Sequence, residues 1–290
     1  MKILILGGHG QVGKELSISL STLYDVTSFN RNQLDITNKK NLSHYFKNNS
    51  PDIVINCAAY TKVDDAEKNK ETAYNINSTA IGNLIAAINN EKTCLIHFST
   101  DYVFSGEGEK YAENSEPNPI NVYGKSKLDG DLKIISKLKN YYIFRISWVY
   151  GLHGNNFPLK IFKKLCLNED LSIVSDQIGI PVSTDFIADV VKAFINKYNS
   201  KRIDSGIYNI TPDGKTSWFK LAEKIHKYVK IKHLSTKNKS IKPILSSQLT
   251  VSADRPKFSV LDNKKLKELN IIRVQSWEKY LYNFLDKLNE

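Results

Sequence analysis

The feature that most constrains the fold is an alternation of short apolar runs with helical segments along the first half of the 290-residue chain. Because strands covered by helices on both faces are apolar throughout rather than at every second residue, this pattern predicts an α/β fold with a doubly wound parallel sheet. The predicted strands are Lys2 to Leu6, Asp25 to Phe29, Asp52 to Asn56, Thr93 to Phe98 and Tyr141 to Ile146, and the predicted helices are Gln11 to Ser21, Asn38 to Asn48, Lys70 to Asn90 and Asn121 to Leu138.

The rhythm changes after Gly151, where helices and strands become shorter and less regular. The strand GIYNI, which begins at Gly206, is expected to join the sheet as its sixth member, and Lys230 to Pro256, which lacks periodicity, is expected to wrap the surface. Residues 1–150 would then form a core and residues 151–290 a smaller, docked lobe with returning core elements. Helices are predicted over Phe157 to Leu167, Phe186 to Tyr198, Ser217 to Val229 and Ser276 to Leu288, with a further strand at LSIV.

A glycine-rich turn, GGHGQVG, directly follows the first predicted strand and opens the first helix. Gly7, Gly10 and Gly13 fit the spacing GxxGxxG, and Gly8 in place of Gly7 fits GxGxxG. Turns without side chains let the backbone approach a pyrophosphate, whose charge is met by N–H groups at the helix N-terminus. The turn therefore predicts a Rossmann-like, dinucleotide-binding core.

The residues after the second strand bear on the choice of coenzyme. An acidic side chain at this place usually accepts hydrogen bonds from the 2′-hydroxyl of the adenosine ribose. Here the positions hold Asn30 and Arg31, and a guanidinium can pair with a 2′-phosphate. We therefore predict NADPH, with NADH still possible. Asp35 and Ile36, in LDIT, either abut the adenine or lead into the next helix.

The stretch VYGKSKLDG places Tyr123 four residues before Lys127 on one predicted helical face. A nearby ammonium favours the phenolate, which would lower the tyrosine pKa and help it to exchange a proton at neutral pH. Upstream, Ser99 and Thr100 end the fourth strand, where open α/β sheets place their ligand crevice. A hydroxyl, a phenol and an ammonium are thus expected beside a nicotinamide site. The hydroxyl would hold a carbonyl oxygen, Tyr123 would donate the proton, and Lys127 would tune the phenol and bind the cofactor ribose.

With these motifs in view, nearly the whole chain resembles the extended short-chain dehydrogenase/reductases, and among them the dTDP-4-dehydrorhamnose reductases. The segments that carry the resemblance are GGHGQVG, LDIT, NCAAYTKVDDAE, YNINSTAIGNL, HFSTDYVFSG, NPINVYGKSKLDG, RISWVYG, GNNF and RPKFSVLD. The resemblance implies NADPH-dependent reduction of the 4-keto group of a dTDP-linked 4-keto-6-deoxyhexose, as in dTDP-L-rhamnose and polysaccharide biosynthesis. It implies Thr100, Tyr123 and Lys127 as the catalytic set.

The same resemblance implies further binding residues. The pyrophosphate would be held by Gln11, Val12 and Gly13; the cofactor would be lined by Ala59, Tyr60, Thr61 and Phe98; the deoxysugar would meet Thr100, Asp101 and Trp148. Trp148 could equally be a core side chain. Arg255, in the aperiodic stretch, is expected either to pair with the nucleotide diphosphate or to form a structural ion pair.

Two departures from related sequences limit the chemistry. Sugar-nucleotide 4,6-dehydratases carry an Asp-Glu pair directly after the threonine, whereas Thr100 is followed here by Asp101 and Tyr102, which disfavours dehydration. Some family members dimerise around a metal held by glutamates; Glu15 is present, but the residue after PVST is the shorter Asp185, which disfavours a metal-linked dimer. The six histidines show no spacing that would gather ligands, so no metal is expected.

Composition and charge bear on other classes of function, and they disfavour nucleic-acid binding, a metal site and membrane association. The formal net charge of +11 would suit nucleic acid, yet the densest basic stretch, Lys230 to Lys242, lacks aromatic residues for base stacking and is expected to be solvated surface. The three scattered cysteines support neither a disulfide framework nor a metal site. Without a signal-like start or a membrane-length apolar run, we expect a cytoplasmic protein, monomeric or homodimeric, that binds neither nucleic acid nor membrane. A non-catalytic, reductase-like regulatory or binding subunit, or a reductase of another nucleotide-linked 4-keto-6-deoxyhexose, remains as an alternative.

Overall fold

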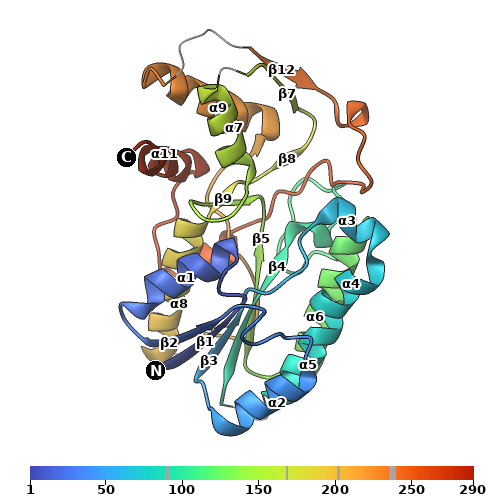
Figure 1. Ribbon diagram of the computed structural model, residues 1–290, viewed down its shortest axis with the longest axis vertical. Helices are drawn as coiled ribbons and strands as arrows, with labels where there is room; N and C mark the ends of the chain where they lie inside the picture. The colour runs from blue at the N-terminus through green and yellow to red at the C-terminus, as the bar shows by residue number, and fades with distance from the viewer. Residues whose placement is uncertain (89–91, 168, 201–202, 235–239) are drawn as a thin grey trace.

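The structure, a computed structural model, describes residues 1–88, 92–167, 169–200, 203–234 and 240–290 (Figure 1). Within those residues the core is a six-stranded sheet of order β10-β5-β4-β3-β1-β2, in which every neighbouring pair is parallel. The order reverses direction between β1 and β3, so the carboxyl ends of these two strands flank the switch point at which α/β sheets bind ligands. The strands are β1 (Lys2–Leu6), β2 (Asp25–Phe29), β3 (Ile53–Asn56), β4 (Cys94–Thr100), β5 (Tyr141–Ile146) and β10 (Gly206–Asn209).

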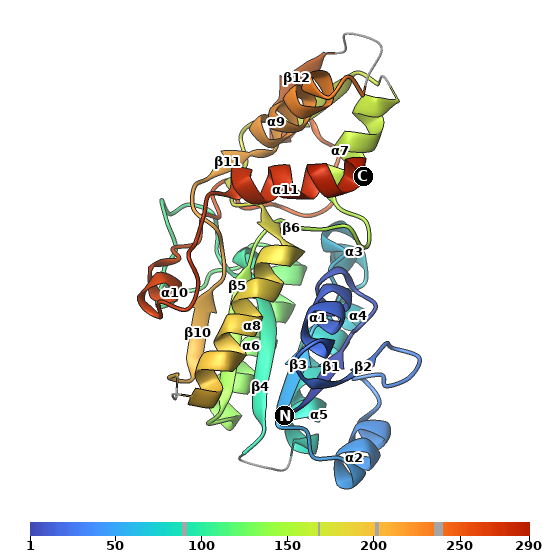
Figure 2. The same cartoon turned by 90° about the vertical axis from the view of Figure 1, so that its left-hand side faces the viewer.

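Helices cover both faces of the sheet, which explains why the central strands β3 and β4 are buried along their whole length, whereas β2 at the edge has no buried residue (Figure 2). On one face α1 (Gln11–Ser21) and α8 (Thr184–Ser200) contribute Leu16 and Phe194 to one buried cluster. On the other face α2 (Lys39–Asn48), α5 (Ala80–Ala87) and α6 (Val122–Lys137) contribute Leu42, Leu84 and Ile134 to a second. The predicted doubly wound α/β fold is therefore confirmed.

The helix predicted over Lys70 to Asn90 is instead three consecutive pieces, a difference with a physical cause. These are α4 (Lys70–Tyr74), a π-helical turn η1 (Asn75–Thr79) and α5, while Asn90 lies outside the described residues. Within η1 the amide of Asn77 donates to the Tyr60 carbonyl (3.0 Å) and accepts from the Tyr60 N–H (2.8 Å). The wider turn places this amide against the loop that leaves β3. A short helix before it, α3 (Val63–Lys68), was not predicted.

The lobe has its own buried cluster, built by α7 (Phe157–Cys166), α9 (Trp218–Ile231) and α11 (Trp277–Asn289). A two-stranded parallel sheet joins β7 (Leu171–Val174) to β12 (Ile241–Ile244). The expectation of an aperiodic surface wrap over Lys230 to Pro256 was therefore wrong for β12 and for the 3-10 turn η3 (Ser246–Gln248), although residues 235–239 lie outside the described residues. None of the helices in the described ranges is long and apolar enough to cross a membrane.

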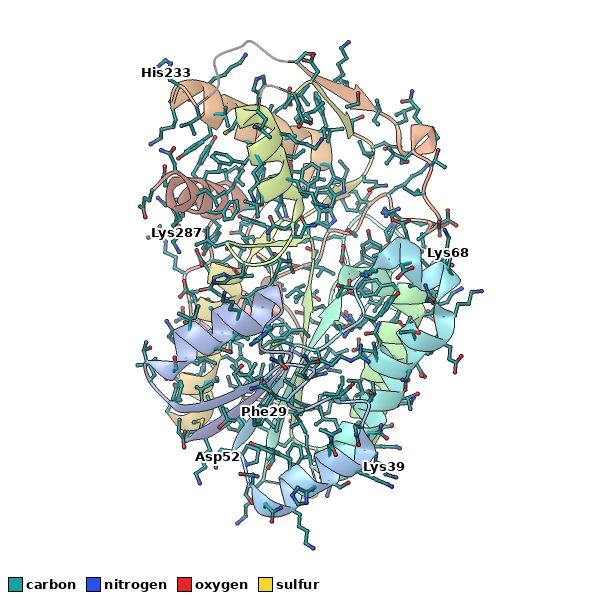
Figure 3. All side chains as sticks on the ribbon, in the orientation of Figure 1. Phe29, Lys39, Asp52, Lys68, His233 and Lys287 are labelled. Atoms are coloured by element: carbon teal, nitrogen blue, oxygen red, sulfur yellow. The ribbon has the colours of Figure 1, made fainter. Side chains whose placement is uncertain are left out.

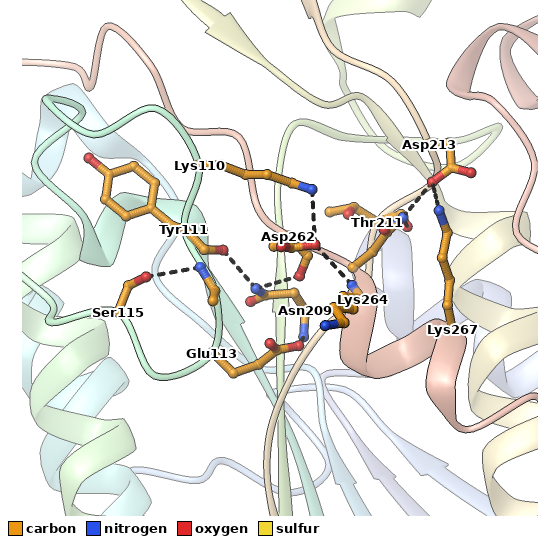
Figure 4. A network of polar contacts seen from close by, with 12 residues as sticks. Lys110, Tyr111, Glu113, Ser115, Asn209, Thr211, Asp213, Asp262, Lys264 and Lys267 are labelled. Atoms are coloured by element: carbon orange, nitrogen blue, oxygen red, sulfur yellow. Dashed lines mark hydrogen bonds and ion pairs between the residues drawn. The ribbon is translucent and has the colours of Figure 1, made fainter.

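Elements after Gly151 also return to the sheet. The sixth strand, β10, was predicted correctly, and Phe186 of α8 and Leu266 of α10 (Lys264–Glu268) lie in the same buried cluster as Tyr208 of β10. At the end of β10 the Asn209 amide donates to the carbonyls of Tyr111 (3.0 Å) and Asp262 (2.9 Å), so three distant segments meet there (Figure 4). The predicted division of the chain into a core of residues 1–150 and a lobe of residues 151–290 stays a prediction. Further two-residue strands are β6 (Val149–Tyr150), β8 (Ile178–Gly179), β9 (Val182–Ser183) and β11 (Thr216–Ser217).

Candidate active site

The carboxyl ends of the strands face the lobe. Figure 3 shows Phe29, the last residue of β2, nearer the lobe than Asp52, which directly precedes β3 and so marks the amino ends of the strands. A cavity of about 570 Å³ lies at this end of the sheet, lined from both the core and the lobe. Its lining includes these predicted site residues: Gly10, Gln11, Val12, Ala59, Thr61, Phe98, Thr100, Asp101, Tyr123, Lys127 and Trp148.

The glycine turn is built so that backbone replaces side chains. Gly7 has φ +76°, and a Cβ there would lie 2.6 Å from the Ala58 nitrogen; a Cβ on Gly13 would lie 2.3 Å from the Gly7 carbonyl oxygen. Gly10 is the N-cap of α1, and among the described residues no side chain caps this helix. The N–H groups of its first turn are thus left for a ligand, and Gly10, Gln11 and Val12 line the cavity. This cradle fits the pyrophosphate of a dinucleotide.

The residues predicted at the adenosine end lie outside the lining of the cavity. Asn30 caps the turn after β2, since its Oδ1 accepts from the N–H groups of Asn32 (2.9 Å) and Gln33 (3.1 Å). The largely exposed Arg31 donates from Nε to Asp35 Oδ2 (2.9 Å). Asp35 Oδ1 accepts from the N–H and hydroxyl of Thr37. These hydrogen bonds match the second of the two roles expected for Asp35, that of shaping the turn that leads into α2. The Ile36 side chain is buried in the core, so an adenine contact there would come from its backbone.

Thr100, Tyr123 and Lys127 line the same wall of the cavity from β4 and α6. The Thr100 hydroxyl accepts from the Tyr102 N–H (3.2 Å) and donates to Asp101 Oδ1 (3.1 Å). The Tyr123 ring packs edge-on against Tyr102, with centroids 5.7 Å apart. Asn121 starts α6 by accepting from the Gly124 N–H (2.8 Å), which fixes the register that brings Tyr123 and Lys127 to the cavity.

The electrostatics of this wall differ from the expectation that Lys127 lowers the pKa of Tyr123. Burial raises the pKa of the Tyr123 phenol, and the neighbouring Asp101 and Asp131 raise it further, against an opposing contribution from Thr100. Lys127 Nζ donates to the Phe98 carbonyl (2.6 Å) and contacts His97 Nε2 (3.0 Å). Tyr123 is therefore held as a protonated phenol, which is the form that can give up a proton. Burial also raises the pKa of the Asp101 carboxyl to about 7.

Trp148 stacks face to face on Trp218, with ring centroids 3.6 Å apart and planes within 10°. Trp148 has φ +43°, a conformation uncommon for a bulky residue, and a Cβ on Gly179 would lie 2.5 Å from its ring. Trp218, the first residue of α9, was missed by sequence reasoning, because nothing local distinguishes it from a core aromatic. Other cavity residues missed in this way are Cys57, Val63, Ile146, Ser147, Val149 and Asn155.

Arg255 and Tyr60 lie beside the cavity rather than in its lining. Arg255 donates to Asp64 Oδ2 (2.5 Å). Of the two roles expected for Arg255, this contact is the structural ion pair and not the contact with a diphosphate. The Tyr60 hydroxyl donates to Asp65. Asp185, the residue after PVST, pairs with Lys287 (2.7 Å), and in the described ranges no group of three or more His, Cys, Asp or Glu side chains could hold a metal ion.

The switch-point cradle together with the Thr-Tyr-Lys wall defines the class of extended short-chain dehydrogenase/reductases. The family model described as "RmlD substrate binding domain" matches residues 1–290. The chain belongs to this family.

Known proteins of similar sequence and structure agree with this membership. A dTDP-4-dehydrorhamnose reductase from Burkholderia thailandensis is 36% identical over 284 residues, which cover 96% of this chain and 95% of the relative. The crystal structure of the Bacillus anthracis dTDP-4-dehydrorhamnose reductase in complex with NADP matches with a TM-score of 0.90 and 35% identity, covering 99% of both chains. The Clostridium acetobutylicum dTDP-4-dehydrorhamnose reductase matches with a TM-score of 0.91 and 34% identity, covering all of both chains.

Proposed function

We propose that the protein reduces the 4-keto group of dTDP-4-dehydrorhamnose to give dTDP-L-rhamnose, with NADPH as reductant. The observation that carries the proposal is that Thr100, Tyr123 and Lys127 line the same cavity as the glycine cradle of Gly10 to Val12. The full-length similarity to reductases of this name supports it, as does the NADP bound by the Bacillus anthracis relative.

The residues of this chain have separate tasks in the reaction. The cradle holds the dinucleotide, and Asn30 and Arg31 lie after β2 where the adenosine ribose is expected. When bound, a reduced nicotinamide supplies the hydride. Thr100 orients the ketone oxygen by hydrogen bonding, and Tyr123 donates the proton that this oxygen needs as the carbonyl becomes an alcohol. Lys127 stabilises the resulting phenolate with its positive charge.

The substrate side of the cavity is supplied by both halves of the molecule. Asp101, whose pKa is raised to about 7, can donate as well as accept a hydrogen bond to a sugar hydroxyl. The stacked Trp148 and Trp218 provide a flat apolar surface for the deoxysugar or the base. Arg255 would have to exchange Asp64 for the diphosphate in order to bind it.

The test is a coupled assay. The purified protein is mixed with an upstream dehydratase and 3,5-epimerase that generate the 4-keto sugar nucleotide from dTDP-glucose, and NADPH absorbance is followed. Consumption of NADPH with formation of dTDP-L-rhamnose, identified by NMR, is the expected result, whereas a different 6-deoxyhexose would indicate another reductase of the same class. Binding of NADPH without any turnover would favour the alternative of a regulatory subunit.

Coenzyme choice is measured in the same assay. Because Asn30 and Arg31 place no carboxylate against a 2′-phosphate, we expect a lower KM for NADPH than for NADH. A clear preference for NADH would contradict this expectation.

A further inference from the structure

A cluster of buried polar side chains surrounds Lys127, and apart from Ser99 its members are absent from the lining of the cavity. It joins α6 to β3 and β4 through Asn56, His97, Ser99 and Asp131, all of which are less than 5% exposed. Placing ionisable groups in such a position is unfavourable unless they are paired, so their arrangement calls for an explanation.

The hydrogen bonds assign the proton of His97. Asn56 Oδ1 accepts from the Ala58 N–H (3.2 Å), which turns its Nδ2 toward His97 Nδ1 at 3.0 Å. Nδ1 must therefore accept, and a neutral imidazole then carries its proton on Nε2. Burial and the neighbouring Lys127 lower the pKa of His97 well below its ordinary value, so the ring is neutral.

The Nε2–H of His97 points at two groups. Lys127 Nζ lies 3.0 Å from Nε2, and Asp131 Oδ1 lies 3.6 Å from it. An ammonium has no lone pair, so it cannot accept this proton and is repelled by it, whereas a neutral amine can accept it. His97 thus disfavours the charged form of Lys127 in its buried position.

Asp131 supplies the opposite bias. It lies four residues after Lys127 on the same helix, its Oδ2 accepts from the Ser99 hydroxyl, and its Oδ1 has no hydrogen-bond partner in the part of the chain that the structure describes. The carboxylate raises the pKa of Lys127 against burial, which lowers it to about 8. Other titratable groups near the pair are the Cys57 thiol, which follows β3 and acts on Lys127, and Tyr123, on which Asp131 acts. Burial raises the pKa of the Asp131 carboxyl, whereas Lys127, the Ser99 hydroxyl and Arg145 of β5 lower it and so favour the carboxylate.

We propose that Asp131 is a positioning residue for the reaction: its buried carboxylate, four residues after Lys127 on α6, keeps Lys127 in the ammonium form against the opposing effect of His97. This inference rests on the proposed role of Lys127 beside Tyr123. It assigns a task to a buried carboxylate that is absent from the lining of the cavity.

The test compares pH profiles of kcat for wild type, Asp131→Asn and Asp131→Glu. Loss of the carboxylate leaves the ammonium less stable, so the alkaline limb should move down by about one pH unit or more, giving roughly a tenfold loss near pH 8 and little loss near pH 6. Asp131→Glu should restore the limb. The matched control is Asp129→Asn, which removes a half-exposed carboxylate two residues away on the same helix and should leave the profile unchanged.

A second measurement does not depend on activity. The titration of Lys127 is followed by NMR of ¹³Cε-labelled lysine, with the signal assigned by its loss in Lys127→Arg, and its midpoint should fall in Asp131→Asn. Equal Lys127 midpoints in wild type and Asp131→Asn, or a kcat that drops equally at every pH, would overturn the proposal.

If wild type shows no turnover, the proposed function fails, while this titration still decides whether Asp131 sets the charge of Lys127. If Asp131→Asn does not fold, Ser99→Ala replaces it: loss of the hydroxyl that holds the carboxylate should shift the midpoint in the same direction by less, and no shift would overturn the proposal.

Discussion

At the scale of single residues, burial affects the pKa values of the groups on the active-site wall more than attraction between charges does. Burial raises the pKa values of Tyr123 and Asp101 and lowers that of Lys127, so each group is biased toward its neutral form. A neutral phenol is a proton donor, and a neutral carboxyl is a hydrogen-bond donor. Burial thus prepares this wall to give protons to a ketone oxygen.

Replacing Tyr123 by phenylalanine removes the proposed proton donor and little else. Acid catalysis by a positioned group is typically worth about 10²- to 10⁴-fold, so kcat should fall by that factor while NADPH affinity changes less than about twofold. Tyr102→Phe is the control, because its ring packs on Tyr123 without belonging to the catalytic set, and its loss should stay below about tenfold. Unchanged turnover in Tyr123→Phe would remove the phenol from the mechanism.

Asp101 makes stability depend on pH in a direction that can be measured. Its pKa in the folded protein, about 7, lies above the ordinary value of 3.8, so its contribution to stability is fully present below about pH 4 and is lost as the pH rises through 7. Asp101→Asn abolishes this titration. The free energy of unfolding of the variant minus that of wild type should therefore be about 1–3 kcal/mol smaller at pH 5 than at pH 8, as measured by urea unfolding. A constant difference would contradict the raised pKa.

At the scale of elements, the predictability of each segment follows its burial pattern. β1, β2, β5 and α1 begin and end at the predicted residues. Buried apolar residues mark the limits of β1 and β5, and the glycine turn marks the start of α1, whereas β2 contains no buried residue. By contrast β12, with its two central residues exposed, has no apolar run to reveal it, and its pairing with β7 depends on a tertiary contact. The two-residue strands carry too few residues for any periodicity.

The same reasoning explains which site residues the sequence could predict. Thr100 and Lys127 follow from general rules, namely the carboxyl end of a parallel strand and a spacing of four on a helix. Trp218 could not be predicted in this way, because its role depends on Trp148, which is distant in sequence and meets it only in the folded chain. Asp131 has the same spacing of four from Lys127, but its burial against His97 and Ser99 of β4 is visible only in the folded chain.

Two glycines provide an element-scale test. Gly13→Ala should press the first turn of α1 against Gly7, costing about 1–3 kcal/mol of stability and weakening NADPH binding. Gly82 in α5 has no atom within 4 Å of the position of an added Cβ, so Gly82→Ala should stabilise the protein by about 0.5–1 kcal/mol. Urea unfolding and NADPH titration measure both variants, and equal effects would mean that the close approach at Gly13 is not needed.

At the scale of the whole molecule, the lobe and the sheet are joined at a few places around the cavity. Asn156 at the start of α7 donates to Gln11 Oε1 (2.9 Å), and the Trp148–Trp218 stack joins the link between β5 and β6 to α9. On the other side the segment of Ser252 to Arg255 runs from β12 toward α3 (Figure 1), where Asp64 accepts from the Ser252 and Ala253 N–H groups (3.2 Å each). The cavity is therefore closed by contacts between parts of the chain that are far apart in sequence.

Asp64→Ala should release this segment without unfolding the protein. Amide exchange at Ser252 and Ala253 should become faster, while the global free energy of unfolding changes by less than about 1 kcal/mol, since the ion pair with Arg255 is partly exposed. Glu71→Ala, which removes an exposed carboxylate from the neighbouring α4, is the control. Unaltered exchange at these amides in Asp64→Ala would mean that other contacts hold the segment.

The π-helical turn of Asn75–Thr79 makes this part of the chain sensitive to its length. A π turn holds one residue more than the regular turn, so deleting a single residue there would restore continuous α-helical bonding. The deletion would also rotate everything on one side of it by about 100°, taking either the Asn77 amide away from Tyr60 or the buried face of α5 away from the sheet. Length variation should therefore be tolerated in the loops around this helix but not inside it.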